Sequence, residues 1–255
     1  MAIQAKQIIL KNFLVNYLSS QIDNPKSSII FIHGWQSESN VWLDLINRFS
    51  DDYNCYALDL PGFGKSELPK TALTNSDYCN IVEEFAAKLK LENYVFVGHS
   101  NGGAIGIKLA ARNTEHLQKL ILISSAGIRQ KSPDTTIKNY IAKILKPLFK
   151  PAFMKPLRLS IYKAMGGEDY VNAGSNTKTY INIISEDLTE VLDQIEKPTL
   201  LIWGASDVPT PLAFGEIMHS RIKNSVLEVL DGDHFVFLKE KAKVYNLILN
   251  FIVKE

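Results

Sequence analysis

Short apolar runs alternate with amphipathic helical patterns along most of the chain, and this order restricts the possible folds more than any other feature. Four runs have the length and continuity of strands buried on both faces, at 27–35, 53–60, 95–100 and 117–127. Helical spacing separates them, at 37–50, 75–90 and 101–112. This order predicts a mostly parallel central sheet with helices on both faces, the α/β class.

The two ends of the chain fit this architecture, but its middle does not. Residues 6–20 alternate well enough for one or two opening strands, and Asn75 or Ser76 is the expected cap of the helix at 75–90. The alternation resumes after the middle, with strands at 198–204 and 225–232 and helices near 210–221 and 239–254. Residues 128–185 contain helical stretches without a convincing strand. We therefore expect an α/β core of residues 1–127 and 186–255, with 128–185 inserted as a helical lid.

Size and charge exclude several classes of function. The chain has 255 residues, of which 46% are hydrophobic and 22% charged, which suits one large soluble α/β domain. Its net charge of +1 argues against general nucleic-acid binding, which needs a concentrated positive field. Residues 127–180 are an exception, with ten Lys or Arg against three Asp or Glu. This basic segment could steer an anionic ligand or a membrane surface, or it could simply be a solvated helical face.

The cysteines and the N-terminus indicate a cytoplasmic protein. Cys55 and Cys79 have no metal-type spacing, so we expect two reduced and mostly buried thiols and no metal site. The first twenty residues contain no signal-peptide pattern, and no segment approaches the ~20 apolar residues of a membrane span. We expect a monomer or a homodimer.

The stretch Gly98-His99-Ser100-Asn101-Gly102 predicts a nucleophilic serine. It fits G-x-S-x-G at a junction between a strand and a helix, the setting of a nucleophile elbow. There the chain turns so sharply that the serine is strained and side chains at 98 and 102 would collide with their surroundings. The strain lifts the hydroxyl clear of the sheet, next to the free N–H groups of a helix N-terminus.

A serine hydroxyl needs an adjacent base, and His234 is the best-placed histidine. It follows the last predicted strand, so it belongs to the same edge of the sheet as Ser100. We expect His99 to pack in the interior, pointing away from Ser100, and His33 to shape a loop. His116 and His219 are expected at the surface.

The histidine in turn needs an acid that fixes its tautomer. Asp207, three residues after the strand that ends at Gly204, is the preferred candidate. Asp59 also ends a strand, but it precedes Ser100 in the chain and opens the tight PGFG turn. Asp231 and Asp233 are too close to His234 in sequence to reach its ring easily. The expected oxyanion donors are the backbone N–H groups of Asn101 and Trp35.

Five motifs in order, HGW, DLPGFGKS, GHSNGG, LLIWGASD and GDHF, make the sequence resemble the α/β-hydrolase superfamily over nearly its whole length. Within the superfamily it is similar to the lid-bearing small-molecule hydrolases, a group that includes carboxylesterases and carbon–carbon bond hydrolases of ring-fission products. The resemblance implies Ser100, Asp207 and His234 as the triad, in the family's chain order, and 128–185 as the lid. Asp233 departs from the pattern, since many relatives have glycine before the histidine. Serine at position 100 argues against the dehalogenases and most epoxide hydrolases, which carry aspartate there.

These observations predict a serine hydrolase that cleaves a small or medium, largely apolar carboxylic ester through an acyl-enzyme on Ser100. No metal or organic cofactor is implied, and GFGKS lacks the glycine at position 59 that a phosphate loop would need. Two alternatives stay open: a carbon–carbon hydrolase of anionic diketo acids, and a ligand-binding protein without catalysis. Apolar lid residues could form the acyl pocket or only pack the lid onto the core: Ile137, Tyr140, Ile141, Ile144, Leu145, Leu148, Phe149 and Phe153.

Overall fold

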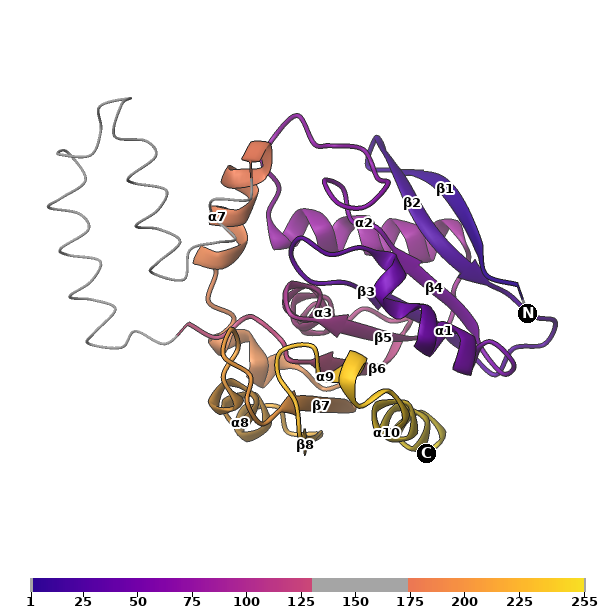
Figure 1. Ribbon diagram of the computed structural model, residues 1–255. Coiled ribbons are helices and arrows are strands. Elements are labelled where there is room, and N and C mark those ends of the chain that lie inside the picture. Colours follow the sequence, from indigo (N-terminus) through magenta and orange to yellow (C-terminus); the bar gives the residue numbers. More distant parts are fainter. Residues whose placement is uncertain (1, 130–173, 255) are drawn as a thin grey trace, which may run out of the picture.

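A single eight-stranded sheet runs through the molecule and positions every candidate site residue. The computed structural model describes residues 2–129 and 174–254 (Figure 1). The strand order in the sheet is β1-β2-β4-β3-β5-β6-β7-β8. β1 pairs antiparallel with β2, and β2 with β4, whereas all the remaining pairs are parallel. The strands are β1 (Gln4–Leu10), β2 (Phe13–Ser20), β3 (Ser28–Ile32), β4 (Asn54–Leu58), β5 (Tyr94–His99), β6 (Leu117–Ile123), β7 (Thr199–Gly204) and β8 (Ser225–Leu230).

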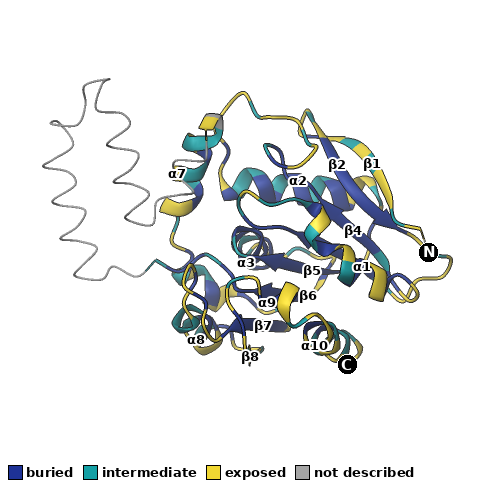
Figure 2. Ribbon diagram, viewed as in Figure 1, coloured by how far each residue is buried: buried dark blue, intermediate teal, exposed yellow. Residues whose placement is uncertain are grey.

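Helices cover both faces of the sheet, because successive side chains of a buried strand point to opposite faces. In β3, Ile30 and Ile32 pack into one apolar cluster while Ile29 and Phe31 pack into the other. The first cluster includes side chains of α2 (Asn75–Lys88), α3 (Asn101–Ala111), α8 (Leu212–Arg221) and the 3-10 helix η4 (Thr189–Gln194). The second includes side chains of the 3-10 helix η1 (Ser39–Trp42), α1 (Leu43–Phe49), α9 (Val236–Lys239) and α10 (Lys241–Val253). In Figure 2 the central strands are buried throughout, and the helices expose only their outer sides.

The predicted α/β architecture is confirmed, with corrections at the ends of elements. The predicted N-cap of α2 was wrong: Thr74 holds that position, in a capping box with Asp77, because its hydroxyl accepts a hydrogen bond from the Asp77 amide at 3.2 Å. The predicted closing helix at 239–254 begins at Lys241 as α10, because Glu240, with φ and ψ of −102° and 42°, is not helical and separates it from the short helix α9. The pattern at 37–50 begins as the 3-10 helix η1 before α1.

Only the two ends of the expected lid lie in the described part of the chain. Its last element is α7 (Thr177–Ser185), preceded by the short 3-10 helix η3 (Gly174–Asn176). The apolar lid residues between 137 and 153, and most of the basic segment, lie outside the described residues. No strand occurs between β6 and β7 in the part of this stretch that is described.

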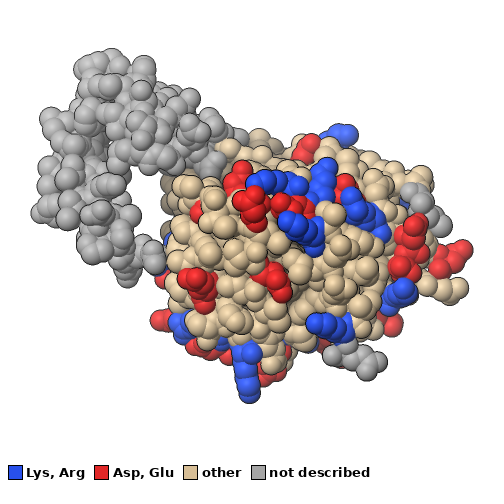
Figure 3. Space-filling model, turned by 60° about the horizontal axis from the view of Figure 1, so that its bottom comes forward, with Lys and Arg blue, Asp and Glu red and all other residues tan. Residues whose placement is uncertain are grey.

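Both cysteines are buried and free, as the sequence predicts. Burial raises the pKa of each thiol to about 12, so neither is a reactive thiolate near neutral pH. None of the helices among the described residues is long and apolar enough to cross a membrane. Acidic and basic side chains stand next to each other on the face shown in Figure 3, in accord with a net charge near zero.

Candidate active site

Ser100 stands on a sharp turn between β5 and α3. Its backbone has a φ of 52° and a ψ of −117°, a conformation that non-glycine residues rarely adopt. Neighbouring glycines make this turn possible. A Cβ on Gly98 would lie 2.4 Å from the Gly102 carbonyl oxygen, and one on Gly102 would lie 2.3 Å from the Ile32 carbonyl oxygen. The two glycines are therefore required by close backbone approaches to α3 and β3, which is the collision that the sequence predicts.

Asp207 and His234 form a hydrogen-bonded pair at the same edge of the sheet. Asp207 follows β7 and His234 follows β8, and the His234 Nδ1 lies 3.1 Å from Asp207 Oδ1 and 3.0 Å from Oδ2. The Asp207 side chain is fully buried. Burial by itself raises the pKa of its carboxyl, but hydrogen bonds from His234 and from the Thr210 amide outweigh it, so the net pKa is lowered. The carboxylate is therefore charged near neutral pH, and it orients the imidazole so that Nδ1 carries the proton.

The rival acid, Asp59, has a different task. It is buried, and its carboxylate accepts hydrogen bonds from the Asn16 side chain at 2.8 Å and from the amides of Ser39 at 2.6 Å and Lys65 at 2.9 Å. These contacts hold the PGFG turn against β2 and η1. The carboxylate of Asp59 is thus engaged by β2, η1 and the turn, and the hydrogen bonds of the His234 imidazole go to Asp207 instead.

The two aspartates beside His234 also turn away from its ring. Asp233 accepts a hydrogen bond from the Phe235 amide at 2.8 Å, and Asp231 pairs with Lys239 at 3.0 Å. The aspartate at position 233 thus contacts the turn after His234, and Asp207 is the carboxylate that contacts the imidazole.

His99, the residue before Ser100, links the serine turn to the histidine loop. The His99 Nε2 donates to the His234 carbonyl oxygen at 2.8 Å, and the centroids of the two rings are 4.7 Å apart. The structure thus brings Ser100, Asp207 and His234 to one region of the sheet edge. The half-buried Ser100 hydroxyl makes no hydrogen bond to His234 among the described residues. Hydrogen bonds of this kind commonly tighten only when substrate is bound.

Burial of His99 is nearly complete, and it lowers the pKa of the imidazole to about 3. His99 is therefore neutral and adds no positive charge beside His234. Its packing role agrees with the sequence-based expectation, but its hydrogen bond to the His234 loop could not be read from the sequence. The exposed positions expected for His116 and His219 are also found.

Two backbone N–H groups near Ser100 are available as donors. Asn101 begins α3, and the amides at the start of a helix have no acceptor within it. Neither the Asn101 N–H nor the Trp35 N–H donates to another described residue. His33 shapes the loop that carries Trp35: its Nδ1 donates to the Gly34 carbonyl oxygen at 2.7 Å, and its Nε2 accepts from the Leu60 amide at 3.1 Å.

Helix α7 lies against the loop that carries the oxyanion candidates. Its Tyr180 ring is 5.0 Å from the Trp35 ring, measured between centroids. Thr179 accepts a hydrogen bond from the Leu73 amide at 3.1 Å, and Asn182 donates to the Leu73 carbonyl oxygen at 3.2 Å. These contacts fasten the last helix of the expected lid to the core beside the site.

A site residue that sequence reasoning missed is Thr210. Its amide donates to Asp207 Oδ1 at 2.9 Å, and its hydroxyl lies 2.9 Å from Asp207 Oδ2 and 3.2 Å from His234 Nδ1. The local signal was an aspartate three residues before a threonine, a spacing at which an aspartate side chain can accept the threonine amide. The contact with His234 has no local signal, because it joins the loops after β7 and β8.

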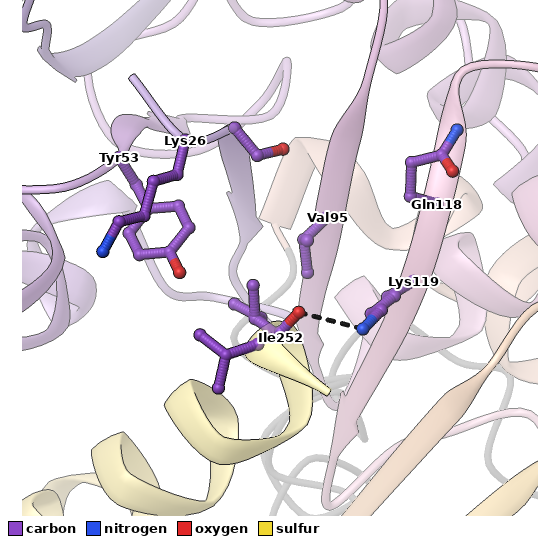
Figure 4. Close-up of a pocket in the computed structure, with 8 residues that line it drawn as sticks. Lys26, Tyr53, Val95, Gln118, Lys119 and Ile252 are labelled. Carbon is purple, nitrogen blue, oxygen red and sulfur yellow. Dashed lines mark hydrogen bonds between the residues drawn. The ribbon is translucent and has the colours of Figure 1, made fainter. Parts of the chain in front are cut away.

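The hollow drawn in Figure 4 lies away from this site. It has a volume of about 270 Å³ and lies at the amino-terminal ends of β5 and β6, beside the end of α10. Its Lys119 ammonium already donates to the carbonyl oxygens of Phe251 at 3.0 Å and Ile252 at 2.9 Å. Lys119 therefore serves to cap the C-terminus of α10. Within the described residues, no group of acidic, histidine and cysteine side chains could hold a metal ion.

Comparison with known proteins identifies the family of the chain. A family model for the alpha/beta hydrolase fold matches residues 28–241, so the chain belongs to the α/β-hydrolase family. It is 29% identical to the uncharacterized hydrolase YugF of Bacillus subtilis, over 90% of this chain and 91% of that protein. It is 24% identical to a monoacylglycerol lipase of Bos taurus, over 89% and 75% of the two chains. The structure of a meta-cleavage product hydrolase from Pseudomonas fluorescens shares the fold, with a TM-score of 0.73, 20% identity and 97% of each chain covered.

Proposed function

We propose that the protein is a serine hydrolase that cleaves a carboxylic ester of a small or medium, largely apolar acid. One observation carries this proposal: a charged, buried Asp207 is hydrogen-bonded to His234 at 3.0 Å, at the sheet edge where Ser100 stands on a strained turn. The similarity to a monoacylglycerol lipase supports an ester as the substrate class. Ser100, Asp207 and His234 form the triad in this proposal, and the N–H groups of Trp35 and Asn101 form the oxyanion hole.

The reaction follows from the proton positions. Because Nδ1 of His234 is held protonated by Asp207, Nε2 has the free lone pair and accepts the Ser100 proton as the oxygen attacks the ester carbonyl. The negative charge that develops on the carbonyl oxygen is stabilised by the two N–H groups. His234 then gives its proton to the leaving alcohol. Water, deprotonated by the same imidazole, releases the acid from the acyl-enzyme.

The division into a core of 1–127 and 186–255 and a lid of 128–185 is part of the proposal. It is supported by the end of β6 at Ile123 and the start of β7 at Thr199, which leave a long connection between adjacent strands. It is also supported by the junction, where the Leu188 amide donates to the Gly127 carbonyl oxygen at 2.8 Å and Arg129 reaches the Glu186 carbonyl oxygen at 3.3 Å.

Labelling with a fluorophosphonate, together with hydrolysis of p-nitrophenyl esters of increasing chain length, tests the proposal. We expect wild-type protein to be labelled at Ser100 and to turn over the shorter esters. Ser100→Ala is expected to lose labelling and nearly all turnover, because no nucleophile remains, while its circular dichroism spectrum stays that of the wild type. Ester turnover retained by purified Ser100→Ala would contradict the assignment.

Carbon–carbon hydrolysis is the second candidate, favoured by the fold shared with a meta-cleavage product hydrolase and by the basic charge of residues 127–180. A ring-fission dienoate assayed beside the esters separates the two activities, because each requires a different bond to be broken. Faster turnover of the dienoate would replace the ester proposal. Absence of labelling and of both activities in folded protein would favour a ligand-binding role.

A further inference from the structure

The buried hydroxyl of Thr210 lies where the loops after three strands meet. Its oxygen is 3.0 Å from the carbonyl oxygen of Ser124 after β6, 2.9 Å from Oδ2 of Asp207 after β7, and 3.2 Å from Nδ1 of His234 after β8. The residue is only 6% exposed.

Counting protons assigns a direction to these contacts. A hydroxyl has one proton to donate and lone pairs that accept, whereas carbonyl and carboxylate oxygens only accept. The Thr210 proton is therefore shared between Oδ2 of Asp207 and the carbonyl oxygen of Ser124, and the lone pairs of the hydroxyl face the Nδ1–H of His234. Each carboxylate oxygen of Asp207 then has one contact from Thr210, through its amide or its hydroxyl, and one from His234.

The backbone of Thr210 is held in place from the other side. Its carbonyl oxygen accepts a hydrogen bond from Nε1 of Trp203 at 2.7 Å, and the Trp203 side chain is fully buried in β7. Because the amide, the carbonyl and the hydroxyl are all engaged, Thr210 has little freedom to move. A rigid partner of this kind fixes the orientation of the charged group it contacts.

We infer that Thr210 is a positioning residue for the Asp207–His234 pair: its hydroxyl fixes the carboxylate and retains the proton on Nδ1, leaving Nε2 of His234 as the base. This inference rests on the proposed function and adds a fourth residue to the proposed triad. It predicts that the hydroxyl, rather than the shape of the side chain, is needed for a high rate.

Three substitutions separate the hydroxyl from the shape. Thr210→Ser retains the hydroxyl, and Thr210→Ala differs from the serine variant only by the absence of that hydroxyl. Thr210→Val retains the branched shape of threonine without the hydroxyl. We expect kcat for the preferred p-nitrophenyl ester to fall about tenfold in the alanine and valine variants, the size typical of one lost hydrogen bond to a charged group. KM should change by less than about twofold, and the serine variant should stay within about threefold of wild type.

The pH dependence of kcat/KM distinguishes a positioning role from a purely structural one, because a purely structural role would leave it unchanged. Without the hydroxyl, the negative charge of Asp207 is shared with fewer donors and acts more strongly on the imidazole, which favours its protonated form. The acid limb of kcat/KM is therefore expected at higher pH in Thr210→Ala than in wild type. Among the described residues, the other titratable group facing the His234 ring is His99, which is neutral in this range, while Asp231 and Asp233 turn away.

Thr199→Val is the matched control. Thr199 is a fully buried threonine at the opposite end of β7, and its hydroxyl donates to the Lys197 carbonyl oxygen at 2.9 Å. The substitution should lower the free energy of unfolding, because a buried hydroxyl and its hydrogen bond are lost. It should leave kcat and the acid limb of kcat/KM unchanged. Circular dichroism and fluorophosphonate titration of active sites, done on every variant, confirm that folded protein is compared.

The outcomes separate this inference from the proposed function. Full kcat in folded Thr210→Ala would overturn the inference, and so would a serine variant as slow as the alanine variant, since shape and not the hydroxyl would then matter. A rise in KM with unchanged kcat would also overturn it. Wild-type protein that is neither labelled nor active would overturn the proposed function and this role with it, whereas labelled and active wild type alongside a fully active Thr210→Ala contradicts the role of Thr210 alone.

Discussion

At the residue scale, the candidate site depends on a carboxylate that stays charged although it is buried. Asp207 achieves this because its oxygens accept hydrogen bonds from His234 and Thr210 that outweigh the cost of burial. The same donors orient it toward Nδ1. Charge and orientation are therefore provided by one set of contacts, and a substitution that preserves shape but not charge should disturb both.

Asp207→Asn is predicted to lower kcat by on the order of 10³- to 10⁴-fold with a smaller change in KM. The side-chain amide nitrogen of the variant is itself a donor, so facing the imidazole it needs an unprotonated Nδ1 as its acceptor. His234 would then adopt the tautomer whose Nε2 carries the proton and cannot act as a base. Steady-state kinetics with a p-nitrophenyl ester measures the effect. Asp231→Asn is the control, because Asp231 is exposed and pairs with Lys239. Unchanged kinetics in Asp207→Asn would require another acid.

At the scale of single elements, local capping decides where α2 begins. Thr74 accepts from the Asp77 amide, and the Asp77 carboxylate accepts from the Thr74 amide at 2.8 Å and from its hydroxyl at 2.7 Å. The helix is therefore fixed at its first turn, from which Asn75 donates to Glu186 at 2.9 Å beside the end of the expected lid.

Thr74→Ala is predicted to lower the free energy of unfolding by about 1 kcal/mol, because the first turn of α2 loses its cap. Thr74→Ser retains the hydroxyl and should lose much less. Urea unfolding followed by circular dichroism gives both values. Equal stability of the alanine variant and the wild type would show that water replaces the cap without loss.

At the scale of the whole molecule, two buried neutral histidines couple folding to pH. Burial lowers the pKa of His99 from 6.5 to about 3 and lowers that of His33 as well. Between these pH values the unfolded chain binds protons that the folded protein does not bind. The stability these histidines contribute is thus fully present above pH 6.5 and is lost as the pH falls toward the folded value.

We predict that the free energy of unfolding is smaller at pH 5 than at pH 7, by about 2 kcal/mol from His99 alone. Urea unfolding at a series of pH values tests this. His99→Gln, which retains a donor but does not titrate, should reduce the slope between pH 5 and 7. A slope that is the same in this variant and in wild type would mean that His99 binds protons equally in both states.

The order of strands and helices, the glycine-bounded turn at Ser100, and the positions of Asp207 and His234 after strands could all be predicted from the sequence. These are local properties, since periodicity, turn chemistry and chain order follow from neighbouring residues. The capping pattern at Thr74 was also local, but several adjacent residues suit a cap, and only the contact with Asp77 selects one.

Which side chains contact one another could not be predicted, because it depends on the folded arrangement of distant segments. In the folded protein, Asp59 contacts the PGFG turn and Asp207 contacts His234. The His99 ring contacts the backbone of His234, and the Thr210 hydroxyl contacts the His234 ring. These contacts join residues separated by up to 135 positions. Such contacts depend on which strands lie side by side and on how far each loop extends past the sheet edge. Neither property can be predicted from residues that are neighbours in the sequence.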